Sequence, residues 1–158
     1  MKILLLLKKL FSKNKKPCIF TFGRKRELEI AECYIKDKEK RKLRIEIIEK
    51  LHNYIEDNKN KKALRIAIEN AIIYGSSGVW EYATTILLRL DNCDTYFSDS
   101  WISLAKYKLH TVRFRVACIL DVMPHPYYDD VVELLKMDKS TKVLNMLEAR
   151  IKERNNRN

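Results

Sequence analysis

Glycine and proline are scarce in this chain of 158 residues, which holds only three of each. A protein built from β-strands needs many more of these residues for its tight turns, so their scarcity excludes an all-β fold and favours helices. Long apolar runs are missing as well, and none approaches the roughly 20 residues that a membrane-spanning helix requires. With 46% hydrophobic and 34% charged residues, the composition is that of a folded globular domain.

Residues for metal binding and nucleophilic chemistry are also few. The cysteines form no Cys-x-x-Cys pair and only three histidines are present, so we expect no metal site and no cofactor. P-loop, glycine-rich and G-x-S-x-G motifs are absent, which predicts a protein that is not an enzyme. Four scattered cysteines are typical of reduced thiols in a cytoplasmic protein, although their even number leaves a disulfide framework open. They are Cys18, Cys33, Cys93 and Cys118.

Positive charge is concentrated near the N-terminus. The net charge is +11, and residues 1–65 carry 20 basic and 9 acidic side chains, whereas residues 66–158 carry 12 of each. Residues 1–16 form a basic amphipathic N-terminal segment with a charge of +6. Two interpretations stay open: a helix that contacts an anionic membrane surface weakly through Leu4, Leu7 and Phe11, and a helix that caps one end of the fold.

Apolar residues recur at helical spacing along the rest of the chain. The clearest stretch places Leu43, Ile47 and Leu51 on one face of a long helix. Short polar turns separate the helical segments, and Ser98 or Asp99 is a candidate N-cap. The predicted helices span residues 24–35, 38–56, 62–74, 79–90, 100–109, 111–123, 127–137 and 140–154.

An internal repeat extends over residues 101–151. Leu104 and Leu135 are 31 positions apart, and the same spacing separates Val112 from Val143 and Leu120 from Ile151. The stretch 112–120 reads VRFRVACIL. It resembles the Val-Arg-x-x-Ala-Ala-x-x-Leu pattern in the second helix of HEAT repeats. The following unit has Asp138 five positions before Val143, where the family often has an aspartate.

The resemblance implies an all-α fold, a short right-handed α-solenoid of HEAT-like helical pairs. Residues 17–158 are then a single HEAT-like domain, and the second helices of the pairs line a concave face. In this family the aspartate of one turn pairs with the arginine of a neighbouring repeat. The resemblance therefore implies a structural ladder contact in which Asp138 accepts hydrogen bonds from Arg113.

Aromatic and acidic residues cluster in the neutral C-terminal half of the chain. Core packing accounts for some of them, and large aromatic side chains also dominate the centres of protein interfaces. Acidic residues at the start of the helix predicted at 127–137 also suit the helix dipole. The candidate partner-binding residues are Trp80, Tyr82, Trp101, Tyr107, Tyr127, Tyr128, Asp129 and Asp130.

In general character the chain resembles small bacterial immunity and antitoxin proteins. This implies a cytoplasmic, non-enzymatic module that binds and neutralises a cognate toxin domain. Two alternatives stay open: a nucleic-acid-binding protein with a groove like that of HEAT-like DNA glycosylases, and a peripheral scaffold or adaptor. The candidate phosphate contacts for the first alternative are Lys38, Lys40, Arg41, Lys42 and Arg44.

Overall fold

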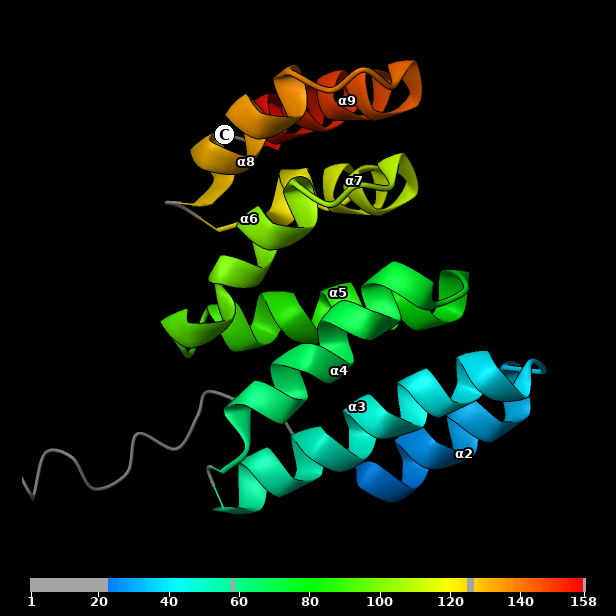
Figure 1. Ribbon diagram of the computed structural model, residues 1–158. Helices are drawn as coiled ribbons and strands as arrows, with labels where there is room; N and C mark the ends of the chain where they lie inside the picture. Colours follow the sequence, from blue (N-terminus) through cyan, green and yellow to red (C-terminus); the bar gives the residue numbers. More distant parts are fainter. Residues whose placement is uncertain (1–22, 58, 125–126, 158) are drawn as a thin grey trace, which may run out of the picture.

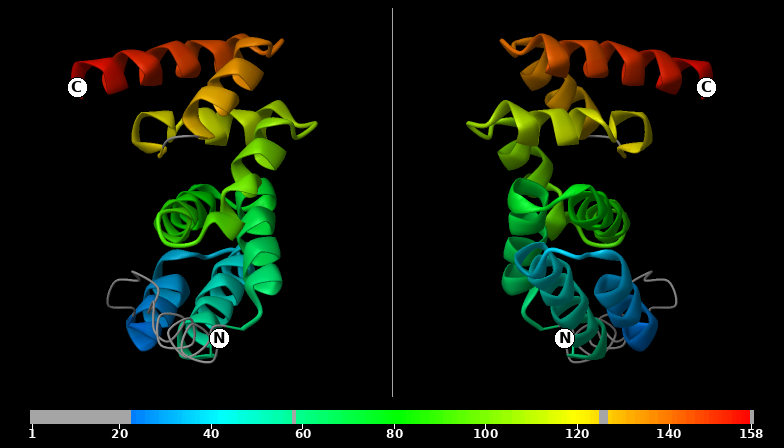
Figure 2. Two further views of the ribbon diagram at one scale, coloured as in Figure 1. Left: turned by 90° about the vertical axis from the view of Figure 1, so that its left-hand side faces the viewer. Right: turned by 90° about the vertical axis from the view of Figure 1, so that its right-hand side faces the viewer.

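The computed structural model describes residues 23–57, 59–124 and 127–157, and within these ranges every regular element is a helix (Figure 1). The prediction of an all-α protein is therefore confirmed for the described residues. The predicted N-terminal segment, residues 1–16, lies outside them. Two further views show that the helices follow one another in chain order from one end of the molecule to the other (Figure 2).

The first part of the described chain consists of four helices joined by short turns. Helix α3 contacts α2, α4 and α5, and α4 contacts α5. The long helix predicted from apolar spacing is α3, and its Ile47, Leu51 and Tyr54 are buried. The bounds are Arg24–Tyr34 for α2, Lys38–Asp57 for α3, Lys61–Tyr74 for α4 and Ser77–Asp91 for α5.

The second part contains three helices that are shorter than those of the first part, a final helix of 17 residues and two 3₁₀ turns. Helix α6 contacts α7 and α8, and α9 contacts α7 and α8. The 3₁₀ turns are η1 (Thr95–Phe97) and η2 (Leu120–Val122). The helices are α6 (Asp99–Ala105), α7 (His110–Ala117), α8 (Tyr127–Lys136) and α9 (Thr141–Arg157).

Two helices are shorter than their apolar patterns predict. Helix α6 ends at Ala105 instead of residue 109, and α7 ends at Ala117 instead of residue 123. Beyond α7 the chain leaves the helix and buries Leu120 and Met123. The main-chain carbonyls of these two residues accept hydrogen bonds from Arg154 Nη1, at 3.2 and 2.6 Å. A side chain from α9 thus stabilises the end of this segment, and no local pattern reports such a contact.

One continuous apolar core joins all eight α-helices of the described chain. At the turn between α4 and α5 this packing requires a residue without a side chain. A Cβ atom on Gly75 would lie 2.3 Å from the carbonyl oxygen of Ala71 and 2.8 Å from the side chain of Val79. The glycine therefore allows α5 to approach α4 closely.

Polar contacts connect the first four helices to the last four. Arg115 on α7 donates from Nη1 to the carbonyl oxygens of Ile72 and Ile73 near the end of α4, at 2.5 and 3.1 Å. Burial lowers the pKa of the Arg115 guanidinium. The last carbonyls of a helix have no N–H donor within the helix, and here a guanidinium from another helix donates to them.

The N-cap position of α6 is Ser98, one of the two predicted residues. Its hydroxyl does not accept a hydrogen bond from α6, however, and instead donates to the buried carboxylate of Asp91. The predicted position is confirmed, whereas the predicted capping role is wrong, because a buried carboxylate at the end of α5 takes up the hydroxyl.

In the described ranges, no helix is long and apolar enough to pass through a bilayer. Cys33 and Cys118 are free cysteines. Cys118 was predicted to lie in the middle of a helix but follows directly after α7, and burial raises the pKa of its thiol. A thiol with a raised pKa is a poor nucleophile at neutral pH.

Candidate protein-binding groove

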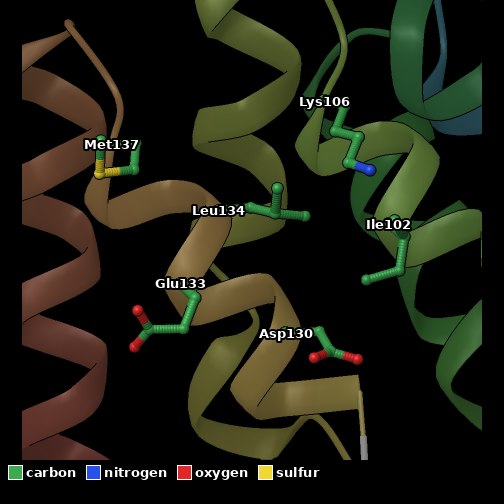
Figure 3. Close-up of a pocket in the computed structure, with 6 residues that line it drawn as sticks. All are labelled: Ile102, Lys106, Asp130, Glu133, Leu134 and Met137. Atoms are coloured by element: carbon green, nitrogen blue, oxygen red, sulfur yellow. The ribbon is translucent and has the colours of Figure 1, made fainter.

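A groove lies between α6 and α8, which contact each other. It holds a pocket of about 480 Å³. Figure 3 shows its lining, in which Leu134 lies between the acidic side chains at one end and Lys106 and Met137 at the other. The six lining residues are Ile102, Lys106, Asp130, Glu133, Leu134 and Met137.

Helical periodicity explains why these side chains face the groove. Trp101, Leu104 and Ala105 of α6 and Val131 and Leu135 of α8 are buried in the core. Ile102 lies on another face of α6, and Lys106 follows one turn later, directly after the end of the helix. Asp130, Glu133 and Leu134 share a face of α8, and Met137 extends this face just past the end of the helix. The α6–α8 groove is thus built on two helices whose inner faces the core holds in place.

The groove continues past the ends of the two helices. A second pocket of about 370 Å³ lies beside the turns that follow α6 and α8, and it shares Lys106, Leu134 and Met137 with the first pocket. Its other lining residues are Ala105, Tyr107, Lys108, Arg113, Asp138 and Lys139. Met137 is 83% exposed, the largest value for a large apolar side chain in the described chain.

Arg113 ties these two turns together. Its Nη1 donates to the carbonyl oxygens of Tyr107 and Lys108, at 2.7 and 2.9 Å. Its Nε and Nη2 donate to the carboxylate of Asp138, at 2.5 and 3.1 Å. The contact that the HEAT resemblance implies between these two side chains is therefore present. The same carboxylate accepts from the backbone N–H of Ser140, at 2.8 Å.

The ion pair changes the pKa of both partners. The hydrogen bonds from Arg113 are the main reason that the pKa of Asp138 is lowered, and the backbone N–H of Ser140 contributes in the same direction. The bond to Asp138 in turn raises the pKa of Arg113. Only 1% of the Asp138 side chain is exposed. This carboxylate is therefore a fixed structural anion and not a free acid at the surface.

Exposed charges of opposite sign stand at the two ends of the groove. The acidic end contains Asp130 and Glu133. The basic end contains three exposed lysines, which we call the lysine cluster: Lys106, Lys108 and Lys139. Between the ends the floor is apolar, so the groove matches a surface that is itself both apolar and charged.

Trp101 was predicted as a partner-binding residue, and this prediction is wrong. The residue is 0% exposed, and its Nε1 donates to the buried carboxylate of Asp91 at 3.1 Å. A buried indole N–H needs an acceptor, and this pairing provides one. Trp101 is a core residue that fixes the start of α6.

Two other predicted aromatic residues lie on α5 beneath arginine side chains. The Arg115 guanidinium lies 5.6 Å from the ring centroid of Trp80, and that of Arg44 lies 4.2 Å from the ring centroid of Tyr82. Burial raises the pKa of Tyr82. These rings are used in contacts between helices, so they do not form an open aromatic surface with the rest of the predicted set.

The remaining predicted residues lie closer to the groove. Tyr127, Tyr128, Asp129 and Asp130 all belong to the first turn of α8, and Tyr128 has the Arg154 guanidinium 3.9 Å from its ring centroid. Asp130 lines the first pocket and Tyr107 lines the second. Of the predicted partner-binding residues, these two therefore belong to the α6–α8 groove.

Several groove residues escape the sequence prediction because none of them is aromatic. One usable signal is the adjacent pair Leu134 and Leu135, since neighbouring positions of a helix point in directions about 100° apart and only one of the two has to face the core. Leu135 is buried, and Leu134 is partly exposed in the groove. A second signal is Met137, an apolar side chain in an otherwise polar turn.

The candidate phosphate contacts on α3 are largely engaged within the protein. Lys40 Nζ donates to the carbonyl oxygen of Tyr74 at 2.6 Å, and Arg41 Nε donates to that of Ile35 at 2.7 Å. Both acceptors lie at the ends of neighbouring helices, where carbonyls lack partners within the helix. These two cations therefore serve as helix caps.

Two further members of this basic set have acidic partners. Arg44 pairs with Glu27 at 3.4 Å, and Lys42 Nζ lies 2.7 Å from Glu39. Lys38 is exposed. A phosphate-binding ridge on α3 would have to displace most of these contacts.

Within the described residues, no three side chains among histidine, cysteine, aspartate and glutamate gather closely enough to hold a metal ion. The chain matches no family model, no curated protein and no solved structure.

Proposed function

We propose that this chain is a non-enzymatic protein-binding module and that the α6–α8 groove is its binding surface. The observation that carries the proposal is the apolar floor around Leu134, which ends at the exposed Met137 and is bordered by charge at both ends. Interface centres combine apolar anchors with a polar rim in this way. Methionine is suited to such a surface because its flexible side chain adapts to different shapes.

We further propose that the helices form a short right-handed α-solenoid of HEAT-like pairs. The contacts of α6 with α8 and of α7 with α9 support this arrangement, because equivalent helices of successive repeats pack on one another. The bond between Arg113 and Asp138 supports it as well. In that arrangement the groove lies between the first helices of two pairs, and not on the second helices that the resemblance implies.

The biological role we propose is that of a bacterial immunity or antitoxin protein, which binds a toxin domain in the cytoplasm and neutralises it. Such a role needs only tight binding, and tight binding benefits from a surface that is formed before the partner arrives. The inner faces of α6 and α8 are buried in the core, so the groove meets this requirement.

The nucleic-acid alternative has less support from the described residues. Lys40, Arg41 and Arg44 are bound to carbonyl oxygens or carboxylates of the protein itself. A scaffold or adaptor would use the same groove and differ only in the identity of its partner, so the experiment below also separates these roles.

The test is direct binding of the protein encoded by the adjacent gene, measured by isothermal titration calorimetry, together with protection of cells that express that protein. A Met137→Glu variant places a charge where the apolar floor of the groove ends and is expected to weaken binding at least about thirtyfold, the effect of removing about 2 kcal/mol of a hot spot. Val122→Glu is the matched control, because Val122 is an exposed apolar residue outside the groove. Equal binding by both variants would exclude the groove, and absence of binding and of protection would exclude the toxin-neutralising role.

A further inference from the structure

The lysine cluster is a concentration of positive charge within a half of the chain that is neutral overall. Lys106 and Lys108 belong to the turn after α6, and Lys139 belongs to the turn after α8. All three are exposed and line the second pocket. Within the described part of the chain, none of them forms an ion pair, so their charges are available to a partner.

The nearby carboxylates do not neutralise this cluster. Asp138 is the only acidic residue among those that line the second pocket, and four cationic residues line it as well. Its carboxylate already accepts from Arg113 and from the backbone of Ser140, and it is turned inward. The pocket therefore keeps an excess of positive charge in the folded protein.

Apolar surface adjoins these lysines directly. Met137 and Leu134 form part of the wall of the same pocket. Leu109, in the turn that carries Lys106 and Lys108, is 46% exposed. Lysine ammonium groups beside exposed apolar side chains match a ligand that carries carboxylates next to large apolar groups.

We propose that the basic end of the α6–α8 groove binds an acidic protein segment in which aspartate or glutamate side chains flank large apolar residues. The carboxylates pair with the lysine cluster, and the apolar residues pack on Met137 and Leu134. This inference rests on the proposed protein-binding function and specifies the chemistry of the partner.

A protein segment fits this surface better than a nucleic acid does. Three lysines would neutralise about three phosphates, which supports only weak binding that falls steeply with salt. The wall of Met137 and Leu134 would gain nothing from a phosphate backbone, whereas it can bury the apolar side chains of a peptide. An oligonucleotide therefore serves as the competing ligand in the test.

The test uses two synthetic peptides that differ only in charge: three repeats of Leu-Glu-Ser-Glu and three repeats of Leu-Gln-Ser-Gln. Binding to the full chain is measured by fluorescence anisotropy, and amide chemical shifts locate the site. We expect the glutamate peptide to bind at least about tenfold more tightly than the glutamine peptide at about 0.05 M salt, with the difference shrinking as salt rises. The largest shifts are expected at Lys106, Lys108, Met137 and Lys139.

A triple variant, K106E/K108E/K139E, is expected to lose at least about tenfold in affinity for the glutamate peptide. The matched control is K25E/K62E/K152E, which changes the net charge equally at exposed lysines outside both pockets. Circular dichroism checks that both variants are folded, and a K106Q/K108Q/K139Q variant repeats the test without reversed charge. Equal losses in the variant and the control, equal binding of the two peptides, or tighter binding of an oligothymidylate than of the glutamate peptide would each overturn the inference.

Failure of this inference can be separated from failure of the proposed function. A toxin domain that binds through Met137 but is unaffected by the lysine variant would overturn the inference alone. Site-specific binding of the glutamate peptide without binding of the toxin domain would overturn the toxin-neutralising role alone.

Discussion

Replacing Asp138 by alanine removes the acceptor of three N–H groups at once: two from Arg113 and one from the backbone of Ser140. A hydrogen bond to a charged group contributes about 1.5–3 kcal/mol, and the bond from the Ser140 N–H, in the turn before α9, adds to the two from Arg113. Arg113 is 20% exposed and keeps its bonds to two carbonyl oxygens, which reduces the loss. We therefore expect Asp138→Ala to lower the free energy of unfolding by about 3 kcal/mol.

A double-mutant cycle isolates the contribution of the pair itself. Arg113→Met keeps the aliphatic part of the side chain and removes the guanidinium, and the double variant with Asp138→Ala completes the cycle. Unfolding in urea at pH 7 should give a coupling energy of about 1.5 kcal/mol. Each single variant leaves one charged group without its ion-pair partner, whereas the double variant removes both groups. A coupling energy below about 0.5 kcal/mol would refute the reasoning, because that is the value of an exposed pair.

The same cycle has a defined pH dependence. The pKa of Asp138 is lower in the folded protein than in the unfolded chain, so the contribution of the pair is fully present well above the unfolded value of about 3.9. It is lost as the pH falls through the folded pKa, because the unfolded chain then binds the proton more readily. A coupling energy that increases on acidification would contradict this sign.

Three further variants test the packing. Gly75→Ala should destabilise the fold by about 1–3 kcal/mol in urea unfolding, because its Cβ would lie 2.3 Å from a backbone oxygen. Gly78→Ala should stabilise the fold by up to about 1 kcal/mol, because no atom lies within 4 Å of the added Cβ. The reverse order of stabilities would contradict the close approach of α4 and α5. Trp101→Phe removes the N–H that donates to the buried carboxylate of Asp91, so it should lower the free energy of unfolding by about 1–3 kcal/mol. An unchanged melting temperature would argue against that bond. Iodoacetamide should modify the exposed Cys33 at least about tenfold faster than Cys118, because burial raises the pKa of the Cys118 thiol. Peptide mass spectrometry measures both rates. A faster reaction at Cys118 would mean that its thiol is not shielded.

Local patterns predicted helices well where each helix is stabilised along its own length. The predicted limits of α2, α3, α4 and α8 agree with the structure to within one residue at each end. Apolar spacing and the residues that interrupt it are properties of neighbours in the chain, so they are readable without a fold. The limits of α6 and α7 were wrong because residues on other helices contribute to them.

The binding surface was less predictable than the helices. Aromatic residues were chosen for their usual role at interfaces, but Trp101 is a core residue and Trp80 lies beneath Arg115. Tyr107 and Asp130 do line the groove. An aromatic side chain has the same identity in a core and at a surface, so only its neighbours in space decide which of these it joins.

By itself, the sequence determined that the chain is helical, where most helices begin and end, and which faces are apolar, because these properties depend on spacing along one segment. The resemblance to HEAT repeats also implied that Arg113 and Asp138 are partners. The tertiary structure alone decided that α6 and α8 lie side by side and that their outer faces enclose a groove. It also decided that Asp138 pairs with Arg113 and that, within the described residues, the three lysines beside it form no ion pair. Those features depend on distances between residues about 30 positions apart in the chain, and such distances exist only once the core has formed.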